Sequence, residues 1–256
     1  MKVEQPGMVG PAAVAATCVA LPSFSDRCKG SARVSLGYRV ASDLGLVKRL
    51  YHRLSDEGVH VWWDKLCLED GKRWEEGFAD GLCSANVFIP VLSRAALASC
   101  AELTAGSDTC DNLVLEHQLA IELEKRGQLR AIFPVFVGEI QSQNSDFYGN
   151  FFDDGGLPKC CNEVVGRIEE KLTAHLSRLG KDAPRLPASE RAVAATLKSI
   201  AEFQGAFFQG SSADAMDEVV VRVRSLLMKL ETEPSAGAGS AGECAVFPAA
   251  LCGGAQ

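Results

Sequence analysis

The chain has 256 residues, of which 47% are apolar and 23% are charged, so it is long enough for one or two domains with a hydrophobic core. Its formal net charge of −7 argues against binding to nucleic acid or to an anionic membrane surface. No uninterrupted apolar run reaches the roughly 18 residues of a membrane-spanning helix, so the sequence predicts no membrane segment.

The two ends of the chain differ in composition from the part between them. Residues 1–31 are rich in Ala, Pro and Gly without a sustained period, and are predicted to form a weakly ordered leader. Residues 232–256 form a low-complexity tail without an amphipathic pattern. One domain is therefore expected over residues 32–231, with an insertion around residues 139–196.

Within this domain, short apolar runs alternate with stretches of helical periodicity. Residues 33–38 form the first predicted strand, and residues 46–58 follow as an amphipathic helix that ends at a glycine. A second strand is predicted over residues 59–63. The segment 64–74 is charged, contains a glycine and is predicted to be a prominent loop.

The centre of the domain continues this alternation. A short helix is predicted over residues 74–84, and the clearest buried strand over residues 86–93. From the end of this strand to Thr109, the sequence has no regular period and predicts an irregular stretch. A helix over residues 112–126 and a strand over residues 131–138 follow.

The remainder of the domain is predicted to hold a helix over residues 163–180, an edge strand over residues 200–208 and a last helix over residues 213–230. Strands that alternate with helices indicate an α/β fold with a mainly parallel, doubly wound sheet and helices on both faces. In such a sheet, ligands bind beyond the carboxyl ends of the strands. The sequence therefore directs attention to residues 38–43 and to the loop 64–74.

Common motifs of nucleotide and hydrolytic sites are absent: the sequence contains no GxGxxG after the first strand and no GxxxxGK[ST], GxSxG or HExxH. A response-regulator receiver shares the predicted architecture but requires acidic residues after its first strand and an Asp after its third. Tyr38 and Arg39 follow the first strand here, and Ser93 ends the third. A receiver domain is therefore excluded.

The ten cysteines include no C-x-x-C pair, and Cys160 and Cys161 are adjacent. Neither pattern suits a zinc site or an ordinary disulfide framework, and the four histidines do not approach the cysteines with ligand spacing. We expect reduced thiols in a cytoplasmic protein, and no metal.

Glu116 is the most informative single residue. On a helix over residues 112–126, its neighbours one turn away include Leu113, Leu119 and Ala120, all of them apolar. A carboxylate in such a stripe is desolvated, partnered or functional. The alternative role of Glu116 is a favourable charge near the positive end of the helix dipole.

Glu122, on the same predicted helix, has Lys125 and Arg126 three and four residues later. This spacing predicts an ordinary ion pair on a solvated face of the helix.

The three tryptophans lie within thirteen residues, around the charged loop. Trp62 and Trp63 point to opposite faces of a strand, so at least one of them is expected in the core. Trp74 begins a helix beside the loop, where its ring is suited to stacking on a flat ligand. Arg39 follows the first strand, where it either binds a phosphate or pairs with Asp43 or Asp64.

Four segments together resemble a Toll/interleukin-receptor (TIR) domain over roughly residues 32–231. They are YRVASD (38–43), VWWDKLCLEDGKRWEEGF (61–78), VFIPVLS (87–93) and LEHQLAIEL (115–123). The resemblance implies a flavodoxin-like sheet of five parallel strands. It also implies that the loop 64–74, with Leu68, Glu69, Asp70 and Gly71, mediates self-association or binding to other TIR domains.

The resemblance further implies one of two activities. Some TIR domains are adaptors that signal only by assembly, whereas others are NAD+ nucleosidases that release nicotinamide and leave ADP-ribose or a cyclic or variant form. The catalytic glutamate of the second group follows a Cys element on the third helix, and Cys110 precedes Glu116 accordingly. NAD+ is then a substrate, and no cofactor is expected.

The residues that the resemblance assigns to substrate binding are Tyr38, Arg39, Asp64, Trp74 and Ser93. Two departures from the family stand out: Gly37 replaces the more usual serine, and the insertion over residues 139–196 is long. Our leading hypothesis is a TIR signalling protein with NAD+ glycohydrolase activity carried by Glu116. The alternatives are a non-catalytic TIR adaptor and another nucleoside-processing enzyme of similar fold, such as a deoxyribosyl transferase.

Overall fold

The computed structural model describes residues 33–68, 70–71, 73–101, 111–138, 162–182, 184–185, 193–208 and 213–232. The predicted leader (1–31), nearly all of the predicted tail (232–256), Glu69 and Cys110 lie outside these ranges, as does much of the predicted insertion.

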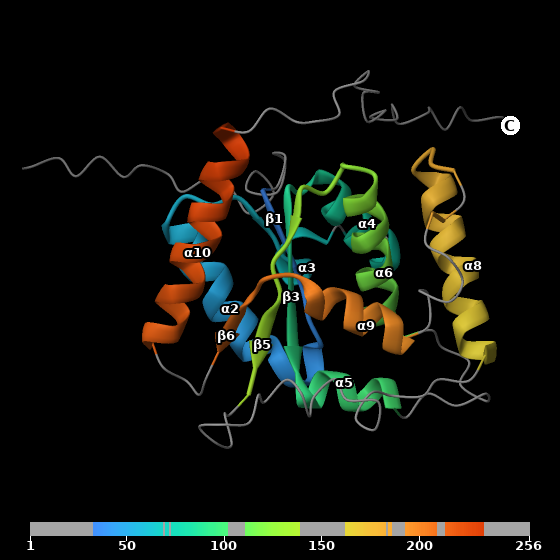
Figure 1. Cartoon of the computed structure of the whole chain (residues 1–256), viewed down its shortest axis with the longest axis horizontal. Helices are drawn as coiled ribbons and strands as arrows, with labels where there is room; N and C mark the ends of the chain where they lie inside the picture. Colours follow the sequence, from blue (N-terminus) through green and yellow to red (C-terminus); the bar gives the residue numbers. More distant parts are fainter. Residues whose placement is uncertain are drawn as a thin grey trace, which may run out of the picture.

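The described residues form a parallel sheet with the strand order β2-β1-β3-β5-β6, in which β4 also pairs with β3 (Figure 1). Every strand pair within these residues is parallel. The strands are β1 (Val34–Gly37), β2 (Val61–Trp62), β3 (Val87–Ser93), β4 (Ala131–Ile132), β5 (Val135–Val137) and β6 (Ala206–Phe208). This is the order of a flavodoxin-like doubly wound sheet, as expected from the sequence.

Helices cover both faces of the sheet (Figure 1). Helices α2 (Val40–Asp56) and α10 (Ala213–Thr232) pack with β1 and β6 in one apolar cluster. The opposite cluster contains residues of α4 (Trp74–Ser84), α6 (Asn112–Lys125), α8 (Asn162–Arg178) and α9 (Val193–Glu202). Because β3 lies between these two layers, all seven of its residues are buried, which explains why the six residues before Ser93 are all apolar.

One expected strand, over residues 131–138, is divided into β4 and β5. Pro134 has no N–H to donate to a ladder, so regular pairing stops there. The chain nevertheless stays against the sheet, because the Phe133 N–H donates to the Phe88 carbonyl at 2.8 Å and the Pro134 carbonyl accepts from Ala206 at 2.9 Å.

The helix expected over residues 46–58 begins six residues earlier, at Val40. Its buried face consists of Asp43, Val47, Leu50, Tyr51 and Leu54. The first buried position of the helix is a carboxylate, Asp43, so the apolar pattern begins only after the helix has started. The side chain of Asp43 accepts hydrogen bonds from the Ser42 and Ser93 hydroxyls, at 2.8 and 3.0 Å.

Three further expectations need correction. The irregular stretch predicted up to Thr109 begins with a helix, α5 (Arg94–Ala101), whose first turn is capped by the Ser93 hydroxyl at 3.0 Å from the Ala96 N–H. The predicted loop 64–74 begins with a helical turn, α3 (Asp64–Cys67). The edge strand predicted over residues 200–208 is limited to β6, because α9 extends to Glu202.

Within the described ranges, no helix is long and apolar enough to cross a membrane. In the same ranges, Cys67, Cys83 and Cys100 are thiols rather than half-cystines.

Candidate functional site

A cavity of about 450 Å³ lies at the carboxyl ends of β1 and β2, between the N-terminal parts of α2, α4 and α6. This is the edge of the sheet at which ligands bind in doubly wound folds. The cavity is lined by Leu36, Tyr38, Arg39, Val40, Ala41, Trp62, Asp64, Lys65, Leu68, Trp74, Phe78, Asn112, Leu113 and Glu116.

The structure brings together most residues that the sequence singled out for catalysis or substrate binding. Glu116, Tyr38, Arg39, Asp64 and Trp74 all line the cavity. They come from four separate elements or the residues directly after them, so no local sequence pattern could show that they meet.

Ser93 does not line this cavity. Its side chain is buried, donates to Asp43 and caps α5, which explains why a hydroxyl stands there. The loop 64–74 is called the association loop here, after its predicted role. Within it, Leu68 lines the cavity, Asp70 and Gly71 are exposed, and Glu69 lies outside the described residues. Gly71 has a φ of 84°, a conformation that favours glycine in the turn.

Glu116 is buried, with 7% of its surface exposed, and reaches the cavity from the second turn of α6. Among the described residues, none forms a hydrogen bond or ion pair with its carboxyl group. Burial raises the pKa of Glu116 well above its usual value near 4.5, and the charge of Asp64 raises it further. Both effects favour the protonated form of the Glu116 carboxyl group.

Gly37 explains how this acid fits against the sheet. A Cβ atom at this position would lie 2.5 Å from the Phe88 ring and 3.0 Å from Glu116 Oε2. Both separations are shorter than carbon and oxygen atoms tolerate without displacement. The glycine at the end of β1 therefore leaves the space that Phe88 and the Glu116 carboxyl occupy, which accounts for the missing serine.

A chain of hydrogen bonds links Trp63 to two residues of the cavity wall, Tyr38 and Asp64. The Trp63 indole N–H donates to the Tyr38 hydroxyl at 2.9 Å, and that hydroxyl donates to Asp64 Oδ1 at 2.8 Å. Burial and the neighbouring Asp64 carboxylate raise the pKa of Tyr38, so the phenol stays protonated. The chain fixes Asp64 at the start of the association loop.

Arg39 makes a different ion pair from those expected with Asp43 or Asp64. Its Nη2 lies 2.6 Å from Oδ2 of Asp111, a residue whose side chain is 4% exposed. Asp111 is also the N-cap of α6, since its Oδ1 accepts the Leu113 and Val114 N–H groups at 2.9 and 3.3 Å. The sequence analysis missed Asp111, although an aspartate directly before a predicted helix is a recognisable capping signal.

Sequence reasoning also missed the apolar wall and two polar groups of the cavity. Phe78 packs against Trp74 with ring centroids 5.0 Å apart, and 39% of Trp74 remains exposed, so its ring is accessible to a ligand. Lys65 contributes a cation from the association loop. Asn112 Oδ1 is buried on the cavity wall and has no hydrogen-bond partner among the described residues.

Trp62 and Trp63 pack in the two opposite apolar clusters, as the alternation of a strand predicts. Both are buried, at 8% and 4% exposure. Trp62 also lines the floor of the cavity, whereas Trp63 reaches it only through Tyr38.

The predicted ion pair of Glu122 with Arg126 is present, but its predicted position on a solvated face is wrong. Glu122 is fully buried, its Oε2 lies 3.4 Å from the Nε of Arg126, and it also accepts the Arg185 backbone N–H at 3.1 Å. Helix α6 is buried on all sides over residues 113–123, because chain segments distant in sequence cover its expected outer face. A buried carboxylate on α6 is thus not in itself a mark of catalysis; what distinguishes Glu116 is the cavity and the lack of a partner within the described part of the chain.

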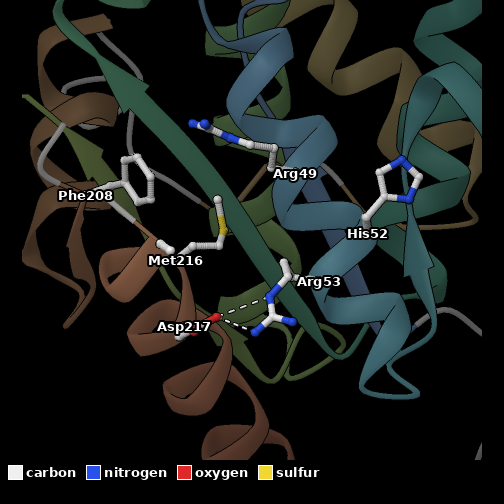
Figure 2. A pocket seen from close by; sticks show the side chains of 7 residues that line it. Arg49, His52, Arg53, Phe208, Met216 and Asp217 are labelled. Carbon is white, nitrogen blue, oxygen red and sulfur yellow. Dashed lines mark hydrogen bonds and ion pairs between the residues drawn. The ribbon is translucent and has the colours of Figure 1, made fainter. Parts of the chain in front are cut away.

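A second cavity, of about 340 Å³, lies between α2 and α10 (Figure 2). Its apolar part is formed by Phe208 and Met216, and Arg53 binds Asp217 at its edge (Figure 2). It contains no residue that the sequence analysis assigned to a site, and the carboxylate that lines it, Asp217, is neutralised by Arg53. The candidate reaction site is therefore the first cavity. Across the described residues, no cluster of His, Cys, Asp or Glu side chains is arranged to hold a metal ion.

The fold and the site together define a flavodoxin-like α/β domain with a cavity at the carboxyl edge of its sheet, lined by two carboxyl groups, Asp64 and Glu116, and two cations, Arg39 and Lys65. Residues 34–156 match the TIR domain family. This match confirms, over residues 34–156, the resemblance to TIR domains that the sequence indicated.

Comparison with solved structures gives 26 matching chains. One of them is the TIR domains of the activated Roq1 resistosome, described as directly recognising the pathogen effector XopQ. It is 15% identical, with a TM-score of 0.48, and the match covers 77% of this chain and 99% of that chain. No curated protein matches the sequence significantly.

Proposed function

We propose that this TIR domain cleaves NAD+ at the bond between nicotinamide and ribose. The observation that carries the proposal is Glu116, a buried carboxyl group without a partner among the described residues, on the wall of a cavity large enough for part of a dinucleotide. The position of Glu116 in the family pattern supports the same role.

The chemistry suits a single carboxylate. When the C1′–N bond breaks, its electron pair goes to the ring nitrogen, nicotinamide leaves as a neutral molecule, and the ribose acquires oxocarbenium character. Glu116, ionised in the presence of the cationic substrate, stabilises that charge. Water then adds to C1′ and loses a proton, which completes the hydrolysis to ADP-ribose.

The other cavity residues fit the remaining parts of NAD+. Trp74 offers an exposed ring for stacking on nicotinamide or adenine. Arg39 and Lys65 supply positive charge for the pyrophosphate. The Tyr38–Asp64 pair provides hydrogen-bonding groups for ribose hydroxyls.

The test is nicotinamide release from NAD+ by the protein at high concentration, with Glu116→Ala as the comparison. We expect release by the natural sequence and none above background by Glu116→Ala. Equal turnover by both proteins contradicts the catalytic role of Glu116. Turnover of thymidine or adenosine in place of NAD+ would instead support a nucleoside-processing enzyme.

The exposed rim of the cavity favours a second candidate function, that of a TIR adaptor. Val40 and Trp74 are 43% and 39% exposed, and Asp70 and Gly71 of the association loop are exposed as well. An apolar rim next to a polar loop is suited to contact with another TIR domain. Assembly that is lost in Asp70→Lys, without any nicotinamide release, supports the adaptor and contradicts the enzyme.

Replacing Asp64 by Asn is expected to move the acid limb of the pH profile to lower pH. The Asp64 charge raises the pKa of Glu116, so its removal lets Glu116 ionise at lower pH. The amide that replaces the Asp64 carboxylate keeps an oxygen that accepts from Tyr38 and from the Lys65 N–H. The measurement is kcat/KM for NAD+ between pH 4 and 9, which reports the free enzyme.

The matched control for this prediction is Asp80→Asn on α4, which removes an equal charge from an ion pair with Arg178 outside the cavity. Its acid limb should stay in place. An acid limb that does not move in Asp64→Asn would show that Glu116 is not the ionising group.

A further inference from the structure

Asp111 uses its two carboxylate oxygens for different purposes. Oδ1 caps α6, the helix that carries Glu116, by accepting the Leu113 and Val114 N–H groups. Oδ2 accepts a hydrogen bond from Nη2 of Arg39 at 2.6 Å. A single buried carboxylate thus holds both the acid-bearing helix and the guanidinium on the cavity wall.

The hydrogen bonding of Arg39 is incomplete in this arrangement. A guanidinium has five N–H donors, and within the described part of the chain only Nη2 of Arg39 is engaged, by Asp111 and by a long contact of 3.8 Å to the Cys100 sulfur. Nε is buried without a partner, and Nη1 donates to no described residue. Unsatisfied donors of a partly buried cation favour an acceptor that arrives with a ligand.

We propose that Asp111 restrains Arg39 on the cavity wall and competes with the phosphates of a nucleotide ligand for its guanidinium. The choice of ligand rests on the proposed function. A phosphate on Arg39 lies close to the Asp111 carboxylate, and the two negative charges repel each other. Asp111 therefore keeps the affinity for phosphate lower than Arg39 alone would give.

The proposal predicts a gain of binding when the charge of Asp111 is removed. In Asp111→Asn, the amide oxygen still caps α6, since Asn is as good an N-cap as Asp. The negative charge beside Arg39 is gone. We expect the Kd for ADP-ribose, measured by titration calorimetry, to fall about three- to tenfold, whereas adenosine, which has no phosphate, binds unchanged.

Two comparisons separate this competition from a general effect of charge or stability. Arg39→Gln should lose the preference for ADP-ribose over adenosine, and the double variant Asp111→Asn/Arg39→Gln should show no gain over Arg39→Gln. Asp217→Asn removes the same charge from another Arg–Asp pair, outside the cavity, and should leave ADP-ribose binding as it is.

Four outcomes overturn the proposal: weaker or unchanged binding of ADP-ribose by Asp111→Asn, an equal gain for adenosine, a gain that persists without Arg39, or no measurable binding of ADP-ribose by the variant. A damaged fold cannot mimic the expected result, because damage does not tighten binding selectively. The calorimetric titration requires no turnover. Failure of nicotinamide release with a gain for ADP-ribose would reject the proposed reaction and leave this inference standing.

Discussion

Glu116→Gln is expected to release nicotinamide at least about a hundredfold more slowly than the natural sequence, and yet to be the more stable protein at pH 8. The amide is close in shape to the carboxylic acid but cannot ionise. It therefore cannot stabilise an oxocarbenium charge, and it avoids the unfavourable ionisation of a buried group.

The pH dependence of this stability difference follows from the raised pKa of Glu116. Below the usual value near 4.5, Glu116 is protonated in both the folded and the unfolded protein, so the two proteins should be equally stable. As the pH rises above 4.5, the unfolded chain ionises first, and the natural sequence loses up to about 1.4 kcal/mol of stability per pH unit. The loss ends once the pH passes the raised pKa of the folded state.

Urea unfolding of both proteins at pH 4, 6 and 8 measures this difference directly. Glu116→Ala is the control, because alanine also cannot ionise but leaves a space where the carboxyl group was. It should not share the higher stability of Glu116→Gln at pH 8, since buried contacts are lost. A Glu116→Gln protein that is less stable than the natural sequence at pH 8 would show that Glu116 has a stabilising partner. Glu116 would then have a structural role instead of a catalytic one.

Gly37→Ala is expected to lower the free energy of unfolding by about 1–3 kcal/mol and to reduce nicotinamide release. The new methyl group meets the Phe88 ring at 2.5 Å and the Glu116 carboxyl at 3.0 Å, in a strand whose residues are all buried. Either the ring or the acid must move. Displacement of Glu116 by a fraction of an ångström is enough to impair a positioned catalytic group.

The matched control is Gly45→Ala, at an exposed position of α2 where a Cβ meets nothing within 4 Å. That change should stabilise the protein by about 0.5–1 kcal/mol, because alanine is the better helix former. Phe88→Leu removes the clashing ring. Gly37→Ala should therefore lower the free energy of unfolding less in the Phe88→Leu background than in the natural sequence. Unaltered stability and activity in Gly37→Ala would refute the tight contact at the end of β1.

The elements that the sequence predicted well are those whose burial follows a simple period. The run from Val87 to Leu92 is apolar throughout because both faces of β3 are covered, and α4 begins at Trp74, as expected. Elements that begin or end at polar buried groups were predicted less well. Helix α2 was placed too late because Asp43 occupies its first buried position, and α5 was missed because its small residues carry little pattern.

The sequence singled out Glu116, which the structure places on the cavity wall, but not the ion pair between Arg39 and Asp111. The apolar neighbours of Glu116 along α6 are a local property, so periodicity was sufficient to single it out. The pairing of Arg39 with Asp111 joins residues 72 positions apart, and no local pattern distinguishes it from pairing with Asp43 or Asp64. The burial of Glu122 depends in the same way on Arg185, which is 63 residues away.

The sequence by itself determined the class of fold, the order of its strands and helices, and the identity of one acid in an apolar stripe. These follow from local periodicity and from a family pattern. Only the tertiary structure decided that Glu116 has no described partner, that Gly37 leaves room for it, and that Asp111 holds Arg39. The physical reason is that a carboxyl group acquires its pKa and its partners from groups that the folded chain brings within a few ångströms, and those groups lie on β1, on α3 and at the start of α6.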